Sequence, residues 1–192
     1  AFVLQNSPQS TAALGGNAGW LGYGGISRSV AIEFDTWKNT CDAFGDEVSV
    51  NLNGDFQNSI GSAASPINLN SGAIGYAWVD YDGITNTLRV YVSEKNQKPT
   101  TPTLVRNIDL AAVLGNRFYA GFTASNYNLP NAHQIVSWSM NLDQPVDPSN
   151  NGPATFALQS TQVTVNESAG EAIVGVVRTG NASAAASFNY QT

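Results

Sequence analysis

Hydrophobic and polar residues alternate with a period of two along much of the first 140 residues, which is typical of half-buried β-strands. The clearest case is residues 29–37, where Glu33 and Asp35 fall on one face and Val30, Ile32 and Phe34 fall on the other. Further strands are predicted over residues 2–5, 48–53, 76–81, 87–92, 117–124 and 134–140. A single helical turn is predicted over residues 109–114, with Asp109 as its cap. The pattern therefore predicts an all-β fold.

Two stretches interrupt the alternation. Residues 15–25 are dense in glycine, which predicts a loop with unusual backbone angles. A phosphate-binding loop is disfavoured, because no Gly-Lys-Ser/Thr follows. Residues 143–153 are rich in proline and polar residues, which predicts a linker between a first domain (1–142) and a second (154–192). Within the second domain, short strands are predicted over residues 155–158, 162–165 and 172–177.

Composition narrows the class of protein. The 192 residues suffice for one sandwich and part of another, and only 11% of them are charged. A net charge of −6 without a basic cluster argues against nucleic-acid binding. Cys41 is the only cysteine, which excludes an internal disulfide and a thiolate metal cage. No apolar run is long enough to span a bilayer. Because the chain begins at Ala1 with an apolar, strand-like segment and without a leader, we expect a fragment of a longer precursor.

Oxygen-bearing side chains gather at one end of the hairpin formed by residues 29–37 and 48–53. Glu33 and Asp35 leave one face of the first strand, Asn39 and Asp42 follow in the connecting loop, and Glu47 opens the returning strand. Ca²⁺ selects such oxygen ligands. The alternative is a solvated acidic turn. Against it, carboxylates between apolar neighbours are costly to bury unless a cation compensates them.

The run VAIEFDTWKN (residues 30–39) resembles the signature of legume and bacterial L-type lectins, in which Glu-x-Asp-x-aromatic-x-Asn builds a paired transition-metal and calcium site. The resemblance covers residues 1–142 and includes AGWLG (18–22), AWVDY (77–81) and HQIVSWS (133–139). It implies a concanavalin-like antiparallel β-sandwich, or jelly roll, that binds carbohydrate in a calcium-dependent manner without changing it. The resemblance also implies an extracellular or cell-surface location.

The resemblance implies which residues hold metal. Ca²⁺ would be bound by Asp35, Asn39, Asp42 and the carbonyl of Trp37. A second divalent ion, Mn²⁺ in the plant members, would be bound by Glu33, Asp35, Asp42 and Glu47. The family usually has His where Glu47 stands. An all-oxygen site favours hard ions such as Mn²⁺, Mg²⁺ or Ca²⁺, so the second site is expected to be altered, weak or empty.

The resemblance also implies the sugar contacts. Asn39 would bond a sugar hydroxyl, Trp37 would stack on the ring, and the Gly19 N–H would donate to the sugar. The remaining candidates are an aromatic residue and a specificity loop, namely Trp20 with Tyr127, Asn128 and Leu129. Core packing is the alternative for both Trp20 and Trp37. We assign three residues to structure: Trp78, Trp138 and His133. The family's other main sugar contact, an Asp, would lie just upstream of Ala1 with the preceding strands, so sugar binding by the chain alone is expected to be crippled.

Residues 154–192 resemble the start of a Calx-β domain. The likeness rests on Val165-Asn166-Glu167-Ser168-Ala169-Gly170 and on Arg178-Thr179-Gly180. It implies a partial immunoglobulin-like β-sandwich of the kind repeated in adhesins. Glu167 would be a calcium ligand in some members, and a spacer role is the expectation here.

Two other functions compete with a lectin. The first alternative is a structural or adhesive module in which calcium stiffens the fold but no sugar is bound. Alternatively, the same sandwich could be a glycoside hydrolase, but Trp37 and Lys38 stand where a second catalytic Glu is needed. A catalytic triad has no support, because His133 is the only histidine and no nucleophile motif is present. The partners we expect are glycans or polysaccharide, with self-association through sandwich faces.

Overall fold

Antiparallel β-strands are the main regular elements of the computed structural model, which describes residues 1–126, 132–142, 155–158 and 176–179. The chain divides into two units, Ala1–Ile135 and Val136–Thr192. The first unit contains β1 (Phe2–Gln5), β2 (Ser29–Asp35), β3 (Glu47–Leu52), β4 (Gly61–Ala64), β5 (Tyr76–Asp82), β6 (Thr87–Ser93), β7 (Leu104–Asn107) and β8 (Tyr119–Phe122). Its short helices are η1 (Ser10–Ala12), η2 (Ala18–Trp20) and α1 (Leu110–Leu114).

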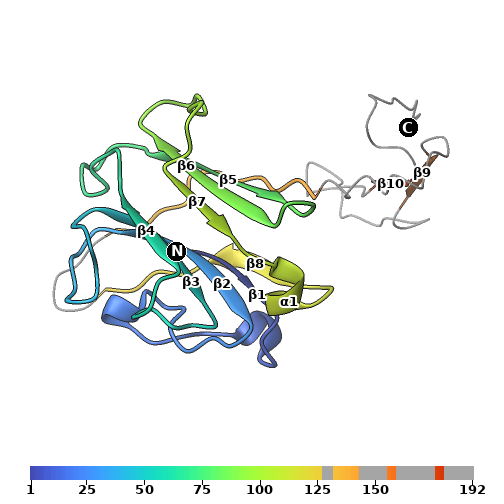
Figure 1. Ribbon diagram of the computed structural model, residues 1–192, viewed down its shortest axis with the longest axis horizontal. Coiled ribbons are helices and arrows are strands. Elements are labelled where there is room, and N and C mark those ends of the chain that lie inside the picture. Colours follow the sequence, from blue (N-terminus) through green and yellow to red (C-terminus); the bar gives the residue numbers. More distant parts are fainter. Residues whose placement is uncertain (127–131, 143–154, 159–175, 180–192) are drawn as a thin grey trace, which may run out of the picture. The chain divides into compact units, whose positions relative to one another are not determined.

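The strands of the first unit form two sheets that lie as separate layers (Figure 1). One sheet has the order β4-β3-β2-β1-β8 and the other has the order β5-β6-β7. Every strand pair in both sheets is antiparallel. This arrangement confirms the predicted all-β, antiparallel architecture.

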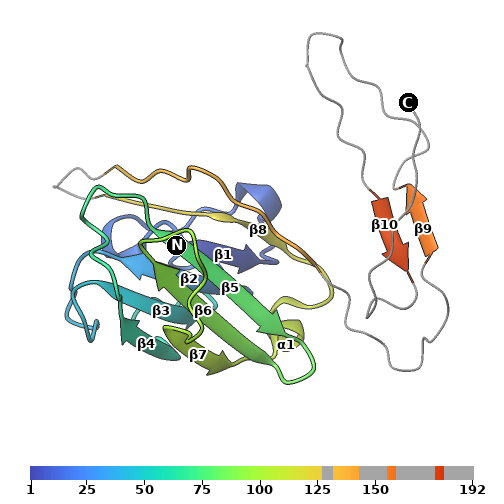
Figure 2. The same ribbon diagram turned by 90° about the horizontal axis from the view of Figure 1, so that it is seen from above.

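The main hydrophobic core lies between the two sheets, where β6 and β7 face β2 and β3 (Figure 2). Val30 and Ile32 of β2 and Val50 of β3 are fully buried and share one cluster with β6 residues Leu88 and Val90. Burying an aliphatic side chain of this size contributes roughly 1.5–3 kcal/mol. The period-two pattern in β2 therefore sends one set of residues into the core and the other set to the opposite face.

The opposite face of the five-stranded sheet is polar at one end and apolar in its middle. The register pairs Asp35 with Glu47 and Glu33 with Ser49, so these four side chains line up across β2 and β3. Beside them, a small second core covers the sheet under the glycine-rich loop; its buried members are Val3, Tyr23, Ile26 and Ala31. Two adjacent strands thus place the acidic residues together, away from the main core.

Residues 15–25 form the predicted loop with unusual backbone angles. Gly22 and Gly25 have φ of +75° and +88°, a region that L-residues rarely adopt. Gly25 N donates to the Gly54 carbonyl at 2.9 Å. Gly54 itself has a φ of +73°, and a Cβ there would lie 2.5 Å from the backbone nitrogens of Gly25 and Ile26. The loop is therefore held against the end of β3 by backbone contact that only glycine permits.

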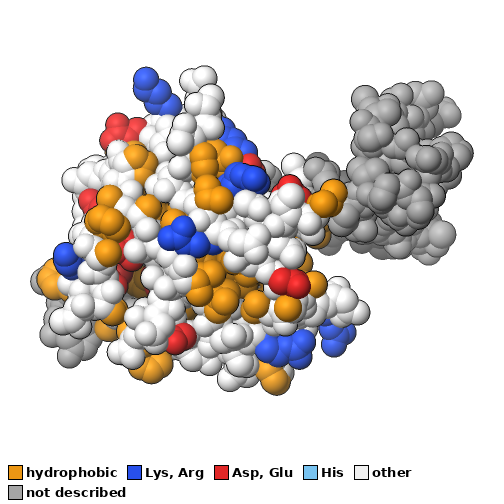
Figure 3. All heavy atoms as spheres, in the orientation of Figure 1, with side chains coloured by type: hydrophobic (Ala, Val, Ile, Leu, Met, Phe, Trp, Pro, Cys, Tyr) orange, Lys and Arg blue, Asp and Glu red, His pale blue; other side chains and the backbone are white. Residues whose placement is uncertain are grey.

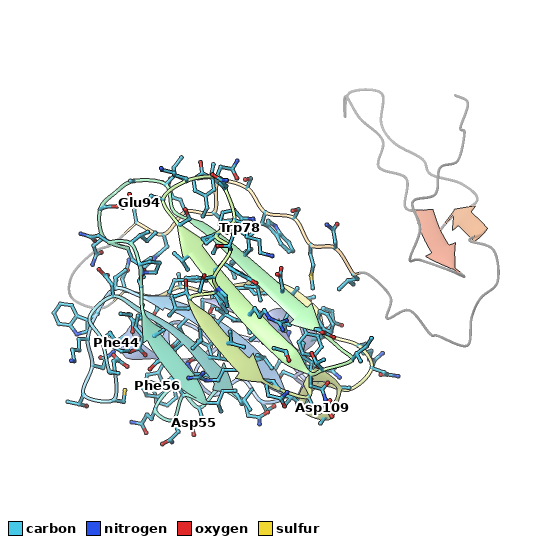
Figure 4. The ribbon with its side chains drawn as sticks, turned by 45° about the horizontal axis from the view of Figure 1, so that its top comes forward. Phe44, Asp55, Phe56, Trp78, Glu94 and Asp109 are labelled. Carbon is cyan, nitrogen blue, oxygen red and sulfur yellow. The ribbon has the colours of Figure 1, made fainter. Side chains whose placement is uncertain are left out.

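Other predictions meet mixed outcomes. The turn at 109–114 is confirmed as α1, with Asp109 Oδ1 accepting from Ala112 N at 2.9 Å (Asp109 is labelled in Figure 4). Strands β4 and β7 were not predicted.

The strand predicted over 134–140 is wrong, because these residues form no strand and are exposed. Trp138 in this segment is 53% exposed, so it is not a core residue, and His133 Nε2 lies 2.9 Å from Asn126 Oδ1.

The described part of the second unit is one antiparallel pair, β9 (Thr155–Leu158) with β10 (Val176–Thr179). The first of these matches the predicted strand, and the second overlaps the end of the one predicted over 172–177. The strand predicted over 162–165 lies outside the described residues.

Among the helices that the structure describes, none is long and apolar enough to cross a membrane. Lys and Arg side chains are spread over several places on the face in Figure 3.

Candidate functional site

Three carboxyl groups are buried at the end of β2 and β3. Glu33, Asp35 and Glu47 are 6%, 6% and 4% exposed, respectively. Strand register brings them together, since Asp35 is the direct partner of Glu47. Glu33 precedes Asp35 by two residues and lies on the same face of β2. The predicted convergence of these residues is therefore found, and their burial excludes the alternative of a solvated acidic turn.

Glu33 is held by hydroxyl groups on both of its carboxylate oxygens. Tyr23 Oη donates to Oε1 at 2.5 Å, and Ser49 Oγ donates to Oε2. Asn51 Nδ2 in turn donates to Ser49 Oγ at 3.0 Å. Tyr23, Ser49 and Asn51 are fully buried, and sequence reasoning did not assign them to the site. Ser49 and Asn51 could have been found, because they are polar residues on the same face of a buried strand as Glu47.

The loop between β2 and β3 is organised by backbone N–H groups that donate to the carboxylates. Trp37 N donates to Asp35 Oδ1 at 2.9 Å, and Asn39 N donates to Asp42 Oδ2 at 2.5 Å. Glu47 Oε2 accepts from the N–H groups of Ala43 and Phe44, each at 3.0 Å. Phe44 projects at this end of the molecule (Figure 4). These bonds fix the loop's path, so Asp35, Asn39 and Asp42 stay close to one another.

Burial raises the pKa of all three carboxyl groups. Desolvation is the largest cause at Glu33, Asp35 and Glu47, and hydrogen bonds to each of them oppose it. The charge of Asp42 further raises the pKa of Asp35 and of Glu47. The charged form of these carboxyls is therefore unfavourable in the metal-free site, and a bound cation would relieve this.

We expect the stability of the metal-free protein to fall as the pH rises from about 4 to about 6. An acid whose folded-state pKa is raised keeps its proton in the folded protein after the unfolded chain has lost it, at about pH 4. Stability is then lost as the pH rises through the folded-state pKa of these carboxyls. The window ends near pH 6, because burial lowers the pKa of the Ala1 ammonium to about 6, which has the opposite effect above that pH.

Urea unfolding with EDTA at several pH values measures this fall, and the same series with Ca²⁺ should reduce it. Ca²⁺ competes with the proton on Asp35, the one of these three carboxyls in the proposed calcium set, and stabilises its charged form. Stability that rose between pH 4 and pH 6 in EDTA would contradict the prediction.

The donors around Asp35 fit a calcium ion. Asp35 and Asp42 supply carboxylates, Asn39 supplies an amide oxygen and Trp37 a backbone carbonyl, which are all ligand types that Ca²⁺ accepts. Asp35 is buried without a salt-bridge partner in the described residues, so an ion would compensate its charge. Within the described ranges, no group of three or more Asp, Glu, His or Cys side chains is arranged to hold a metal. Two carboxylates with neutral oxygens satisfy the calcium set without such a group.

Asn39 lies directly against the glycine-rich loop. A Cβ added to Gly19 would sit 3.2 Å from Asn39 Oδ1 and 3.3 Å from Nδ2, so only glycine leaves room for this side chain as it stands. Ser125 Oγ donates to the Ala18 carbonyl at 2.7 Å, which ties the segment after β8 to the same loop. Three distant parts of the sequence therefore meet at one place, and two of the predicted sugar contacts, Gly19 and Asn39, are adjacent.

The two candidate tryptophans differ in their surroundings. Trp37 is 63% exposed, so its indole is available on the surface. Trp20 packs against Phe56 in a tilted pair with 4.7 Å between ring centroids and covers Gly16 and Gly24, although it is still 46% exposed. This geometry accounts for Trp20 by packing. The predicted specificity loop, Tyr127, Asn128 and Leu129, lies outside the described residues.

The first unit is thus a two-sheet antiparallel sandwich with a buried acidic cluster beside a glycine-rich loop. The sequence profile of the legume lectin domain family matches residues 1–155. This chain belongs to the legume lectin domain family. The match confirms the L-type lectin part of the predicted resemblance.

Relatives and solved structures agree with this assignment. The chain is 33% identical over 143 residues to the L-type lectin-domain containing receptor kinase VIII.1 of Arabidopsis thaliana, covering 72% of this chain and 20% of that protein. Its identity to the probable receptor kinase S.5 of the same plant is 37% over 152 residues, or 72% of this chain and 22% of that protein. The chain thus spans about a fifth of the length of these relatives.

Two solved lectins share the fold. Winged bean acidic lectin, complexed with methyl-α-D-galactose, matches with a TM-score of 0.53 and 23% identity, over 67% of this chain and 53% of that one. The lectin from Bauhinia forficata, in complex with GalNAc, matches with a TM-score of 0.50 and 23% identity, over 66% of this chain and 57% of that one. These likenesses confirm the concanavalin-like sandwich.

Proposed function

We propose that the first unit binds carbohydrate in a calcium-dependent manner and does not change it chemically. The observation that carries this proposal is the contact between Asn39 and Gly19, which joins the loop after buried Asp35 to the glycine-rich loop. A sugar hydroxyl placed there would meet both an amide side chain and a backbone N–H group. Membership of a lectin family supports the same function.

In this proposal the calcium ion would be held by Asp35, Asn39, Asp42 and the Trp37 carbonyl. The ion would neutralise the carboxylates and stiffen the loop between β2 and β3. The chain's own groups do the rest: Asn39 bonds a sugar hydroxyl, the Gly19 N–H donates to the sugar, and the exposed Trp37 indole stacks on the apolar face of the ring. The side chains that recognise the sugar are therefore neutral.

The first probes are methyl-α-D-galactose and GalNAc, because two lectins of the same fold were solved with these sugars. Calorimetry with the chain in Ca²⁺ should give binding that EDTA abolishes, and a glycan array extends the search. A version extended upstream should bind more tightly, since the family places a further Asp contact there. Calcium binding without any sugar binding by either version would instead favour a calcium-stiffened structural module.

Replacing Gly19 by Ala is expected to weaken sugar binding by about tenfold and Ca²⁺ affinity by less, because Asn39 is only one of the proposed calcium ligands. The new Cβ would lie 3.2 Å from Asn39 Oδ1, so Asn39 has to shift away from the sugar. Gly121→Ala is the matched control, because a Cβ there meets nothing within 4 Å. Sugar calorimetry on both variants decides the matter, and equal affinities would remove Gly19 and Asn39 from the binding site.

The wider setting of the domain is also part of the proposal. An extracellular or cell-surface, adhesin-like protein fits a glycan-binding unit followed by residues that resemble a Calx-β spacer. The antiparallel pair of β9 and β10 supports a second β-unit. If this unit is only a spacer, Glu167→Gln leaves the calcium stoichiometry unchanged. Secretion of the tagged full-length protein tests the location, and light scattering tests self-association through sandwich faces.

A further inference from the structure

We propose that this chain binds a single divalent ion, and that hydrogen bonds from Tyr23 and Ser49 to Glu33 replace the second ion of the paired site implied by the L-type lectin resemblance. The single ion is the calcium of the proposed function, on which this inference rests. The proposal concerns Glu33 and Glu47, the two residues that would bind only the second ion. Both are present and buried, but each is engaged with the protein itself.

Glu33 has no carboxylate oxygen left without a protein donor. Tyr23 Oη donates to one oxygen at 2.5 Å and Ser49 Oγ donates to the other. A hydroxyl hydrogen directed at each oxygen takes one of its two lone pairs, so a metal ion would have to share Glu33 with both donors or displace one of them. Tyr23 is fully buried, so an ion that displaced its hydroxyl would leave that donor without an acceptor, which is unfavourable.

The two hydroxyl groups that donate to Glu33 are themselves held in place by neighbouring residues. Ser49 accepts from Asn51 Nδ2 at 3.0 Å, which leaves its own hydroxyl hydrogen to point at Glu33. Tyr23 belongs to the small second core with Val3, Ile26 and Ala31, so its ring cannot swing away. The donors are therefore fixed by the fold and are not free to make room for an ion.

The Glu47 side chain is hydrogen-bonded to the loop between β2 and β3, which precedes it in the sequence. Its Oε2 accepts the N–H groups of Ala43 and Phe44 at 3.0 Å, which closes the loop between β2 and β3. The part of the chain that the structure describes has no group of three acidic, His or Cys side chains arranged for a metal. Asp35 and Asp42 also accept hydrogen bonds from this loop, whereas Glu33 is held by buried hydroxyls on both oxygens. We therefore assign Asp35 and Asp42 to the one ion, for which two carboxylates with neutral oxygen ligands suffice.

Metal analysis of the whole chain tests the proposal. After dialysis against Ca²⁺, we expect one Ca²⁺ per chain, and Mn²⁺ titrated at saturating Ca²⁺ should give no protein-bound electron paramagnetic resonance signal. Glu33→Gln should leave both results unchanged, because the amide can keep hydrogen bonds to the same hydroxyls. A bound Mn²⁺ that Glu33→Gln removes would overturn the inference and leave the proposed function standing. Absence of any bound ion would overturn both.

A second measurement tests the network without metal. In EDTA, Tyr23→Phe and Ser49→Ala should each lower the melting temperature by ~2–4 °C, and Ca²⁺ or Mn²⁺ should not change that difference. A melting temperature unchanged in EDTA, or a difference that appears only with Mn²⁺, would mean that these hydroxyls serve an ion instead and would overturn the inference.

Discussion

Replacing Asp35 by Asn is expected to weaken Ca²⁺ binding by about 100-fold or more, which corresponds to about 3 kcal/mol, and to abolish sugar binding with it. Asp35 is the buried carboxylate of the proposed calcium set. It accepts a hydrogen bond from the Trp37 N–H, and the amide oxygen of Asn can still accept the same bond. The substitution thus removes a charge and preserves the shape. Calcium and sugar calorimetry on the same preparation measure both effects.

The same variant should not be less stable than the parent in EDTA. Burial raises the pKa of Asp35, so its charge is unfavourable when no ion is present, and Asn carries none. Loss of calcium binding together with unchanged or increased metal-free stability separates a ligand from a residue needed for folding. Asp80→Asn is the matched control, because Asp80 pairs with Lys98 on the exposed face of the other sheet. Calcium affinity that survived in Asp35→Asn would refute the proposed site.

The sequence predicted the acidic cluster because two simple periodicities combine there. Alternation in β2 puts Glu33 and Asp35 on one face, and an antiparallel hairpin returns Glu47 next to them. These relations depend on two strands that follow one another in the sequence, so they follow from local pattern alone. The same holds for the Asp109 cap of α1, where residue types and spacing define a local hydrogen bond.

What local pattern could not supply is contact between parts that are distant in sequence. Tyr23 reaches Glu33 only after the glycine-rich loop folds over the sheet, and its position among glycines gave no sign of a partner. Trp20 is similar, since its packing on Phe56 and two glycines depends on that same loop. Residues 134–140 show the converse failure, because a strand needs a hydrogen-bonding neighbour as well as alternation.

The contact of the glycine-rich loop with the turn after β3 depends on Gly54, and Gly54→Ala is expected to destabilise the first unit by about 2–4 kcal/mol beyond the cost of its backbone angle. Gly54 has a φ of +73°, and an added Cβ would lie 2.5 Å from the nitrogens of Gly25 and Ile26. No side chain can yield there, because both contacts are backbone atoms. The loop has to move away from β3, and the Gly19–Asn39 contact should be lost with it.

Gly72→Ala is the matched control, because Gly72 has a φ of +75° and a Cβ there meets nothing within 4 Å. This control shares the cost of a left-handed backbone, about 1 kcal/mol, and lacks the clash. The difference between the two variants in urea unfolding therefore measures the steric cost alone. Because the loop is part of the proposed sugar site and not of the calcium set, Gly54→Ala should lose sugar affinity while the folded fraction still binds Ca²⁺. Equal free energies of unfolding for the two variants would show that the loop can move away from β3 at no cost. The contact between Gly19 and Asn39 would then need another explanation.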